Sequence, residues 1–258
     1  MHAERGDAPR KLGRRQELAA TPQLPEVSRH RIGRLTTDPP SSDAAGQRDA
    51  AGLGLRGRLK HATRDLHRQA QRSGIMQRLL LGRIERPGYG ALLRNLHEIY
   101  AGLETALEAR FEHPLLAPIL FRALFRRANI ESDLRFLHGD RWAEEIAVLP
   151  AAASYRARLD EISSAEPALL VAHAYVRYLG DLSDGQIVYQ LVAERLGLGE
   201  AGSRFYQFGS AEDIDVLVAR FRAGLDAIPA DATEVDRIAD EAQRALRLHI
   251  DLYEQLAG

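Results

Sequence analysis

Residues Tyr175–Gln186 read Tyr-Val-Arg-Tyr-Leu-Gly-Asp-Leu-Ser-Asp-Gly-Gln, and this stretch says more about the fold than any other. It starts as an apolar helix and then places Gly180, Asp181 and Gly185 close together. A glycine inside a helix costs about 1 kcal/mol relative to alanine. Two of them predict a weakened or kinked helix.

Close approach of a ligand to the backbone is a common reason to accept glycine in a helix. The stretch therefore predicts a helix that lies against a flat ligand, with the carboxylate of Asp181 held over it. The same spacing also fits a plain break between two helices, in which Asp181 or Ser183 caps the second helix.

A second informative segment, Leu59–Ala70, lies far upstream. Taken as a helix, it places Lys60, Thr63 and His67 on one face. A neutral histidine can bind a metal through one ring nitrogen, and the amide oxygen of Gln71 could accept a hydrogen bond from the other. Lys60 would then meet an anionic edge of the same ligand. A lone histidine on an amphipathic helix is more often a packed or half-exposed residue, so this alternative stays open.

Together the two segments resemble the haem oxygenase family. The family shows L-K-x-A-T-x-x-x-H near its N-terminus and Y-x-R-Y-L-G-D-L-S-G-G-Q in its distal helix. Further matching segments follow in the family order: Gly88–Tyr100, Gly139–Trp142, Glu166–Tyr175 and Ile250–Leu256. The resemblance covers residues 55 to 256. It implies an all-α, single-domain helical bundle, with haem held between a proximal N-terminal helix and a kinked distal helix.

The composition fits one globular domain of this kind. The chain has 258 residues, of which 45% are hydrophobic, and a net charge of −1. This balance gives no reason to expect a nucleic-acid partner. Cysteine is absent, which excludes disulfides and thiolate ligation of iron or zinc. No apolar run reaches the roughly 20 residues of a membrane-spanning helix, and we expect a soluble, cytoplasmic protein.

The first 52 residues differ from the rest of the chain. They are rich in Arg, Pro and small residues and contain the breaker cluster Pro39–Ser42. We expect residues 1–52 to be a disordered extension and residues 53–258 to be the folded domain.

Within the folded domain, hydrophobic periodicity predicts helices only. The apolar positions Leu92, Leu96, Ile99, Leu103 and Leu107 indicate an amphipathic helix with Pro87 in its first turn. Other helices are expected over 150–162, from Pro167 onward, over 214–227 and over 233–256.

The resemblance assigns roles to the site residues. His67 falls on the position of the proximal iron ligand, and Asp181 on that of the carboxylate that organises water on the distal side. Tyr100 and Arg177 belong in or near the same network, although Tyr100 also fits simple core packing. The family uses haem b as both cofactor and substrate, so a meso carbon of the porphyrin is oxidised by O2.

Other residues are expected to contact haem b. The resemblance places Lys60, Tyr175 and Arg222 at the propionates, where a guanidinium can grip a carboxylate. A solvated surface position is the alternative for Arg222. Gly180 and the segment Ser183, Asp184 and Gly185 are expected to cover the distal face.

Three positions depart from the family pattern. Gln71 stands where the family usually has Glu, which predicts a weaker iron–histidine bond. Asp184 stands where the family has Gly; its carboxylate could crowd the pocket, point outward, accept a hydrogen bond or approach the iron. Val218 stands where a second base is common, and Arg220 is a possible substitute.

The resemblance implies an enzyme that cleaves haem to biliverdin, ferrous iron and carbon monoxide. Electrons would come from an external ferredoxin or flavoprotein reductase, and a biliverdin acceptor is a further candidate partner. One alternative is a haem-binding or haem-sensing protein of the same fold with impaired turnover. Another is a helical relative that acts on small molecules without haem.

Overall fold

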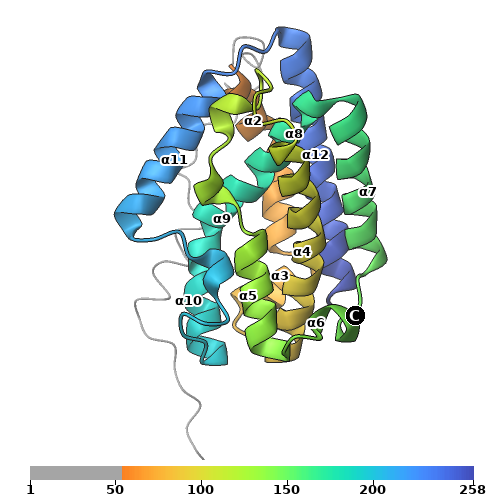
Figure 1. Cartoon of the computed structure of the whole chain (residues 1–258), viewed down its shortest axis with the longest axis vertical. Coiled ribbons are helices and arrows are strands. Elements are labelled where there is room, and N and C mark those ends of the chain that lie inside the picture. Colours follow the sequence, from red (N-terminus) through yellow and green to blue (C-terminus); the bar gives the residue numbers. More distant parts are fainter. Residues whose placement is uncertain (1–53) are drawn as a thin grey trace, which may run out of the picture. The chain divides into compact units, whose positions relative to one another are not determined.

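The computed structural model describes residues 54–258, so the extension expected at residues 1–52 lies outside the described part of the chain. Regular structure in the described part is helical throughout, as predicted (Figure 1). The longer helices are α2 (Leu55–Gln71), α3 (Gly74–Leu80), α4 (Arg86–Glu108), α5 (Arg127–His138), α7 (Pro150–Ala165), α10 (Asp184–Leu196), α11 (Ala211–Asp226) and α12 (Ala232–Gln255). The shorter elements are α6 (Trp142–Glu145), α8 (Leu170–Ala174), α9 (Gly180–Leu182), a π-helical turn (Tyr175–Leu179) and 3₁₀ turns at Ala117–Ile119, Arg122–Leu124, Pro167–Leu169 and Arg204–Tyr206.

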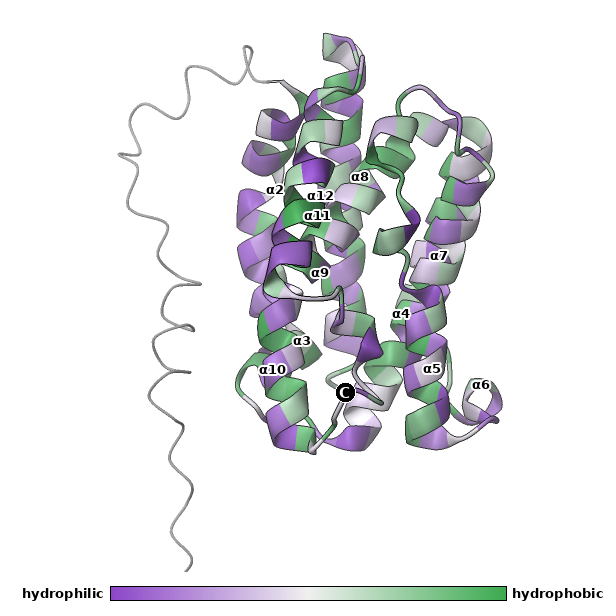
Figure 2. Cartoon of the chain, turned by 60° about the vertical axis from the view of Figure 1, so that its left-hand side comes forward, coloured by the Kyte–Doolittle hydropathy of each residue, from purple (hydrophilic) through white to green (hydrophobic). Residues whose placement is uncertain are grey.

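Amphipathic helices build the core. α12 packs along α2, α7 and α8, and α4 packs against α5 and α7. The predicted apolar positions of α4 are all buried: Leu92, Leu96, Ile99, Leu103 and Leu107. In Figure 2, hydrophilic and hydrophobic residues alternate along the helices, as expected when only one face of each helix meets the core. None of the described helices combines the length and apolarity that crossing a bilayer requires.

Proline or capping residues mark the starts of four of the longer helices, α4, α7, α11 and α12. Pro87 lies in the first turn of α4 and Pro150 is the first residue of α7, as predicted. The helix predicted to begin at residue 214 begins earlier, at Ala211. Ser210 and Asp213 form a capping box there, in which each side chain accepts a hydrogen bond from the other residue's backbone N–H.

The segment from Pro167 to α10 is interrupted rather than continuous. Pro167 opens a 3₁₀ turn before α8, a π-helical turn follows α8, and Ser183 separates α9 from α10. The predicted kink is therefore present, but it lies at Ser183 (φ −105°, ψ −83°), whereas Gly180 has helical backbone angles (φ −60°, ψ −46°). Ser183 occupies the N-cap position of α10, yet its hydroxyl donates to the Leu179 carbonyl at 2.6 Å instead of capping the helix.

Candidate functional site

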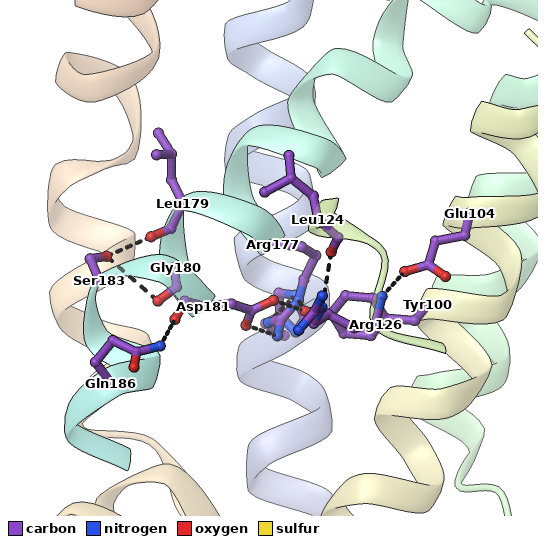
Figure 3. Close-up of polar contacts among 11 residues, drawn as sticks. Tyr100, Glu104, Leu124, Arg126, Arg177, Leu179, Gly180, Asp181, Ser183 and Gln186 are labelled. Carbon is purple, nitrogen blue, oxygen red and sulfur yellow. Dashed lines mark hydrogen bonds and ion pairs between the residues drawn. The ribbon is translucent and has the colours of Figure 1, made fainter. Parts of the chain in front are cut away.

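Tyr100, Arg177 and Asp181 form one buried hydrogen-bonded cluster between α4 and the interrupted helix, which we call the distal cluster (Figure 3). The Tyr100 hydroxyl donates to Asp181 Oδ2. Arg177 donates from Nε to the Tyr100 hydroxyl at 2.9 Å and from Nη2 to Asp181 Oδ1 at 2.9 Å. Both oxygens of the Asp181 carboxyl therefore have protein partners, and the three residues predicted for the distal side lie together.

Burial and charge act against each other in the distal cluster. Burial raises the pKa of Asp181, while the positive charge of Arg177 and the hydrogen bond from Tyr100 oppose that rise. Burial acts to lower the pKa of Arg177, but Tyr100 and Asp181 outweigh it and hold that pKa well above its ordinary value. Arg177 thus keeps its charge, and Asp181 is the member best placed to gain or lose a proton.

His249 of α12 completes the distal cluster, and the sequence interpretation missed it. Its Nε2 lies 3.1 Å from Arg177 Nη1, and its ring is almost fully buried. Burial lowers the pKa of His249 well below its ordinary value, so the neutral ring accepts the hydrogen bond from Arg177. The available signal was a histidine within an apolar stripe of α12, between the buried residues Leu246 and Tyr253.

His67 is the ring-nitrogen ligand that the sequence predicts, and its side chain is 46% exposed. Its Nε2 lies 3.1 Å from Oδ2 of Asp184, at the start of α10. Gln71 donates from Nε2 to the same Asp184 oxygen at 2.7 Å. The prediction that the Gln71 amide oxygen would accept a hydrogen bond from His67 is wrong, because the amide turns across to the other helix.

Of the possibilities considered for Asp184, the structure shows the one in which its carboxylate accepts hydrogen bonds. Burial acts to raise the pKa of the Asp184 carboxyl, but the hydrogen bonds and charge from His67 and Gln71 outweigh it and leave the pKa below its ordinary value. The carboxylate is ionised near neutral pH and faces α2.

The expected distal-face residues have different surroundings. A Cβ built on Gly180 would meet no atom within 4 Å, so open space lies over this backbone. A Cβ on Gly185 would lie 3.3 Å from the Tyr206 ring, so Gly185 packs into the protein instead. Ser183 is exposed. Of the two glycines, only Gly180 borders open space, as close approach of a flat ligand to the backbone requires.

The three residues expected at the propionates lie on different helices. Lys60 of α2 and Arg222 of α11 are exposed and make no ion pair within the described residues. Tyr175 is half-buried; burial raises its pKa, while Thr63 and Arg222 oppose that rise. Arg220, considered as a substitute for the base missing at Val218, lies over the Phe121 ring at 4.3 Å.

Two further histidines on helices, His97 and His173, bond protein groups other than those around His67. His97 bonds Glu131 at 3.1 Å and packs edge-on against Trp142. His173 is fully buried between Tyr155 and Glu241. Both are structural residues of the helix packing.

The donor set fits a metal that brings most of its own ligands. Within residues 54–258, no group of three or more His, Cys, Asp or Glu side chains could hold a bare ion. Haem supplies four porphyrin nitrogens and needs only an axial ligand from the protein. The half-exposed imidazole of His67 and the open space over Gly180 are consistent with such a group.

Comparisons with known proteins agree with this geometry. The family model described as heme oxygenase matches residues 53–255. Heme oxygenase 1 of Nostoc sp. is 35% identical over 205 residues, which are 79% of this chain and 86% of that protein.

Solved structures give the same result. The structure of heme oxygenase-2 from Synechocystis sp. in complex with heme and NO aligns with a TM-score of 0.76 at 33% identity, over 79% of this chain and 85% of that chain. Heme oxygenase-1 from Synechocystis sp. in complex with heme aligns with a TM-score of 0.74 at 31% identity, over 79% and 92% of the two chains.

Proposed function

The chain belongs to the haem oxygenase family, and we propose that it binds haem b through His67 and cleaves it to biliverdin, ferrous iron and carbon monoxide. One observation carries the assignment of the site. The five residues Gly180–Asp184 border open space at Gly180, join the distal cluster at Asp181 and contact His67 at Asp184. A single short stretch thus links the expected iron ligand to the expected proton-handling group.

The bound haem supplies both the iron at which O2 is activated and the porphyrin carbon that is oxidised. The protein's contribution is to position groups around it. His67 offers one imidazole nitrogen from α2, and the bare backbone at Gly180 lets the ring approach the helix closely.

The distal cluster handles the proton that the reaction requires. The Tyr100 hydroxyl donates to Asp181 Oδ2, and Arg177 donates to both residues through its guanidinium. A water held by this cluster would be oriented without a free charge beside it, because the Asp181 carboxylate already has two partners. His249 accepts a hydrogen bond from Arg177 Nη1 and so helps to position the guanidinium.

Binding of the propionates would use Lys60, Tyr175 and Arg222. They belong to α2, the π-helical turn and α11, and Lys60 and Arg222 are exposed cations. Arg222 lies near enough to Tyr175 to oppose the rise in the pKa of its phenol. Electrons would come from a separate ferredoxin or flavoprotein reductase, and O2 is the oxidant.

Titration with hemin tests the assignment of His67. The His67→Ala variant should still bind hemin but lose the optical and electron-paramagnetic signals of an imidazole-bound ferric iron, and added imidazole should restore them. His61→Ala is the matched control, because His61 is an exposed histidine on the same helix. Wild-type spectra from the His67→Ala variant would overturn the assignment.

A further inference from the structure

Asp184 makes the contact between α10 and α2 that bears most directly on haem binding. Its Oδ2 lies 3.1 Å from His67 Nε2 and accepts a hydrogen bond from Gln71 Nε2 at 2.7 Å. His67 and Gln71 are one helical turn apart on α2. Their side chains therefore both contact the Asp184 carboxylate of α10. We call these three residues the α2–α10 clasp.

The clasp and an axial iron bond need the same atom. A hydrogen bond from His67 Nε2 to a carboxylate requires a hydrogen on that nitrogen, whereas metal binding at Nε2 requires its lone pair. The two states of the ring exclude each other. Iron can bind at this nitrogen only after the Asp184 carboxylate has moved away.

The surroundings of Asp184 permit such a movement. Its side chain is 29% exposed, so the carboxylate can find water when it leaves the ring. It also directly follows the helix break at Ser183, where the backbone departs from helical angles. The first turn of α10 can therefore shift without unwinding the rest of that helix.

We propose that Asp184, held by Gln71, competes with haem iron for Nε2 of His67 and thereby weakens and slows haem binding. The clasp stabilises the haem-free protein, and by reciprocity whatever stabilises that form alone opposes the ligand. The inference rests on the proposed function in one respect, namely that His67 is the axial ligand.

The first test needs no haem. A double-mutant cycle with His67→Ala, Asp184→Gly and the double variant measures the coupling between the two residues from denaturant unfolding of the haem-free protein. Asp184 also lies at a helix N-terminus, where a negative charge is favourable by itself, and the cycle cancels that contribution. Additive effects of the two substitutions would show that His67 and Asp184 do not interact in the haem-free protein, which would overturn the competition.

The second test is stopped-flow binding of hemin to the full chain. Asp184→Gly should bind hemin about tenfold more tightly, with a faster association rate, a typical size for a coupled equilibrium. Gln71→Ala should change both in the same direction, which keeps the test usable if the Asp184 variant folds poorly. Glu212→Gly is the matched control, since Glu212 is an exposed acidic residue in the first turn of α11.

Hemin affinity that is unchanged in both Asp184→Gly and Gln71→Ala would overturn the competition. That failure is distinct from failure of the proposed function, which shows as imidazole-type spectra persisting in His67→Ala. Coupling in the haem-free cycle together with tighter hemin binding by both variants is the expected result.

Discussion

At the scale of single residues, the Tyr100 hydroxyl links the two charged members of the distal cluster, because it accepts from Arg177 and donates to Asp181. Tyr178 is its contrast. It is equally buried, but its hydroxyl has no hydrogen-bond partner among the described residues. Comparing the two tyrosines therefore distinguishes the contribution of a hydrogen-bonded hydroxyl from the contribution of the buried ring.

We expect Tyr100→Phe to lower the free energy of unfolding by about 1–3 kcal/mol, since it leaves buried polar partners unsatisfied. It should also slow haem cleavage, because Asp181 loses the hydroxyl that donates to it. Tyr178→Phe, the control, should change neither quantity appreciably. Denaturant unfolding and hemin turnover measure both, and equal effects of the two substitutions would contradict the role given to Tyr100.

Single residues also differ in how well their positions in the site can be predicted from the sequence. Motif position predicts His67, Asp181 and Tyr100, and the structure joins Tyr100 to Asp181 by a hydrogen bond. The role of His67 as iron ligand stays a prediction. Gln71 was misplaced because the spacing of four residues allows a bond to His67, while the structure turns the amide to Asp184, 113 residues away. His249 was missed because nothing local to α12 indicates that Arg177 lies opposite it.

At the scale of elements, the interrupted helix leaves the backbone of Gly180 uncovered at the proposed site. Gly180 and Gly185 are both helical, but only Gly180 borders open space. The two glycines therefore predict opposite responses to the same added methyl group.

Gly180→Ala should leave the haem-free protein as stable or stabilise it by up to about 1 kcal/mol, because alanine is the better helix former. The methyl group enters the open space, so hemin affinity should fall. In Gly185→Ala the methyl group meets Tyr206 at 3.3 Å, and stability should fall instead. Unfolding and hemin titration of both variants check this; hemin affinity unchanged by Gly180→Ala would show that haem does not approach this backbone.

The starts of helices could be predicted where a residue such as proline determines the helix end locally. Proline positions predicted the starts of α4 and α7. Glycine content did not predict the exact site of the kink. The break lies at Ser183, which the alternative of two separate helices names as a candidate N-cap, although its hydroxyl bonds back to Leu179. Tertiary packing decides at which of several candidate residues the helix breaks.

At the scale of the whole molecule, a buried ionic network joins α7, α8 and α12. Glu241 of α12 accepts two hydrogen bonds from Arg158 of α7, at 2.9 and 2.7 Å, and one from His173 of α8 at 3.0 Å. Tyr155 bonds the other nitrogen of the His173 ring. The network joins α12, which carries His249, to α8, which leads directly into the π-helical turn that carries Arg177. It therefore helps to position both residues of the distal cluster.

The pH dependence of stability should report this network. Burial acts to raise the pKa of Glu241, but His173 and Arg158 outweigh it and lower the pKa from 4.5 to about 2. The folded protein therefore binds the proton less well than the unfolded chain. The resulting stabilisation, on the order of 3 kcal/mol, is complete above pH 4.5 and is lost as the pH falls toward 2.

Glu241→Gln should remove that dependence and lower stability near pH 7 by about 3 kcal/mol, since it removes the buried carboxylate that pairs with Arg158 and His173. Arg158 then keeps only its exposed partner, Glu161. Asp160→Asn is the control, because Asp160 pairs with Arg156 at the surface of α7 and should matter by less than about 1 kcal/mol. Unfolding free energies measured between pH 3 and 7 test both. A wild-type slope in Glu241→Gln would assign the acid sensitivity to other groups.

If this chain binds haem and cleaves it, as we propose, its absorption spectrum must record both events. The full chain is mixed with one equivalent of hemin and then given a reductant in air while its absorption spectrum is followed. We predict a Soret band that decays as biliverdin absorption appears and carbon monoxide is released. A Soret band that forms and then persists under reduction would contradict the claim, because the protein would hold haem without cleaving it.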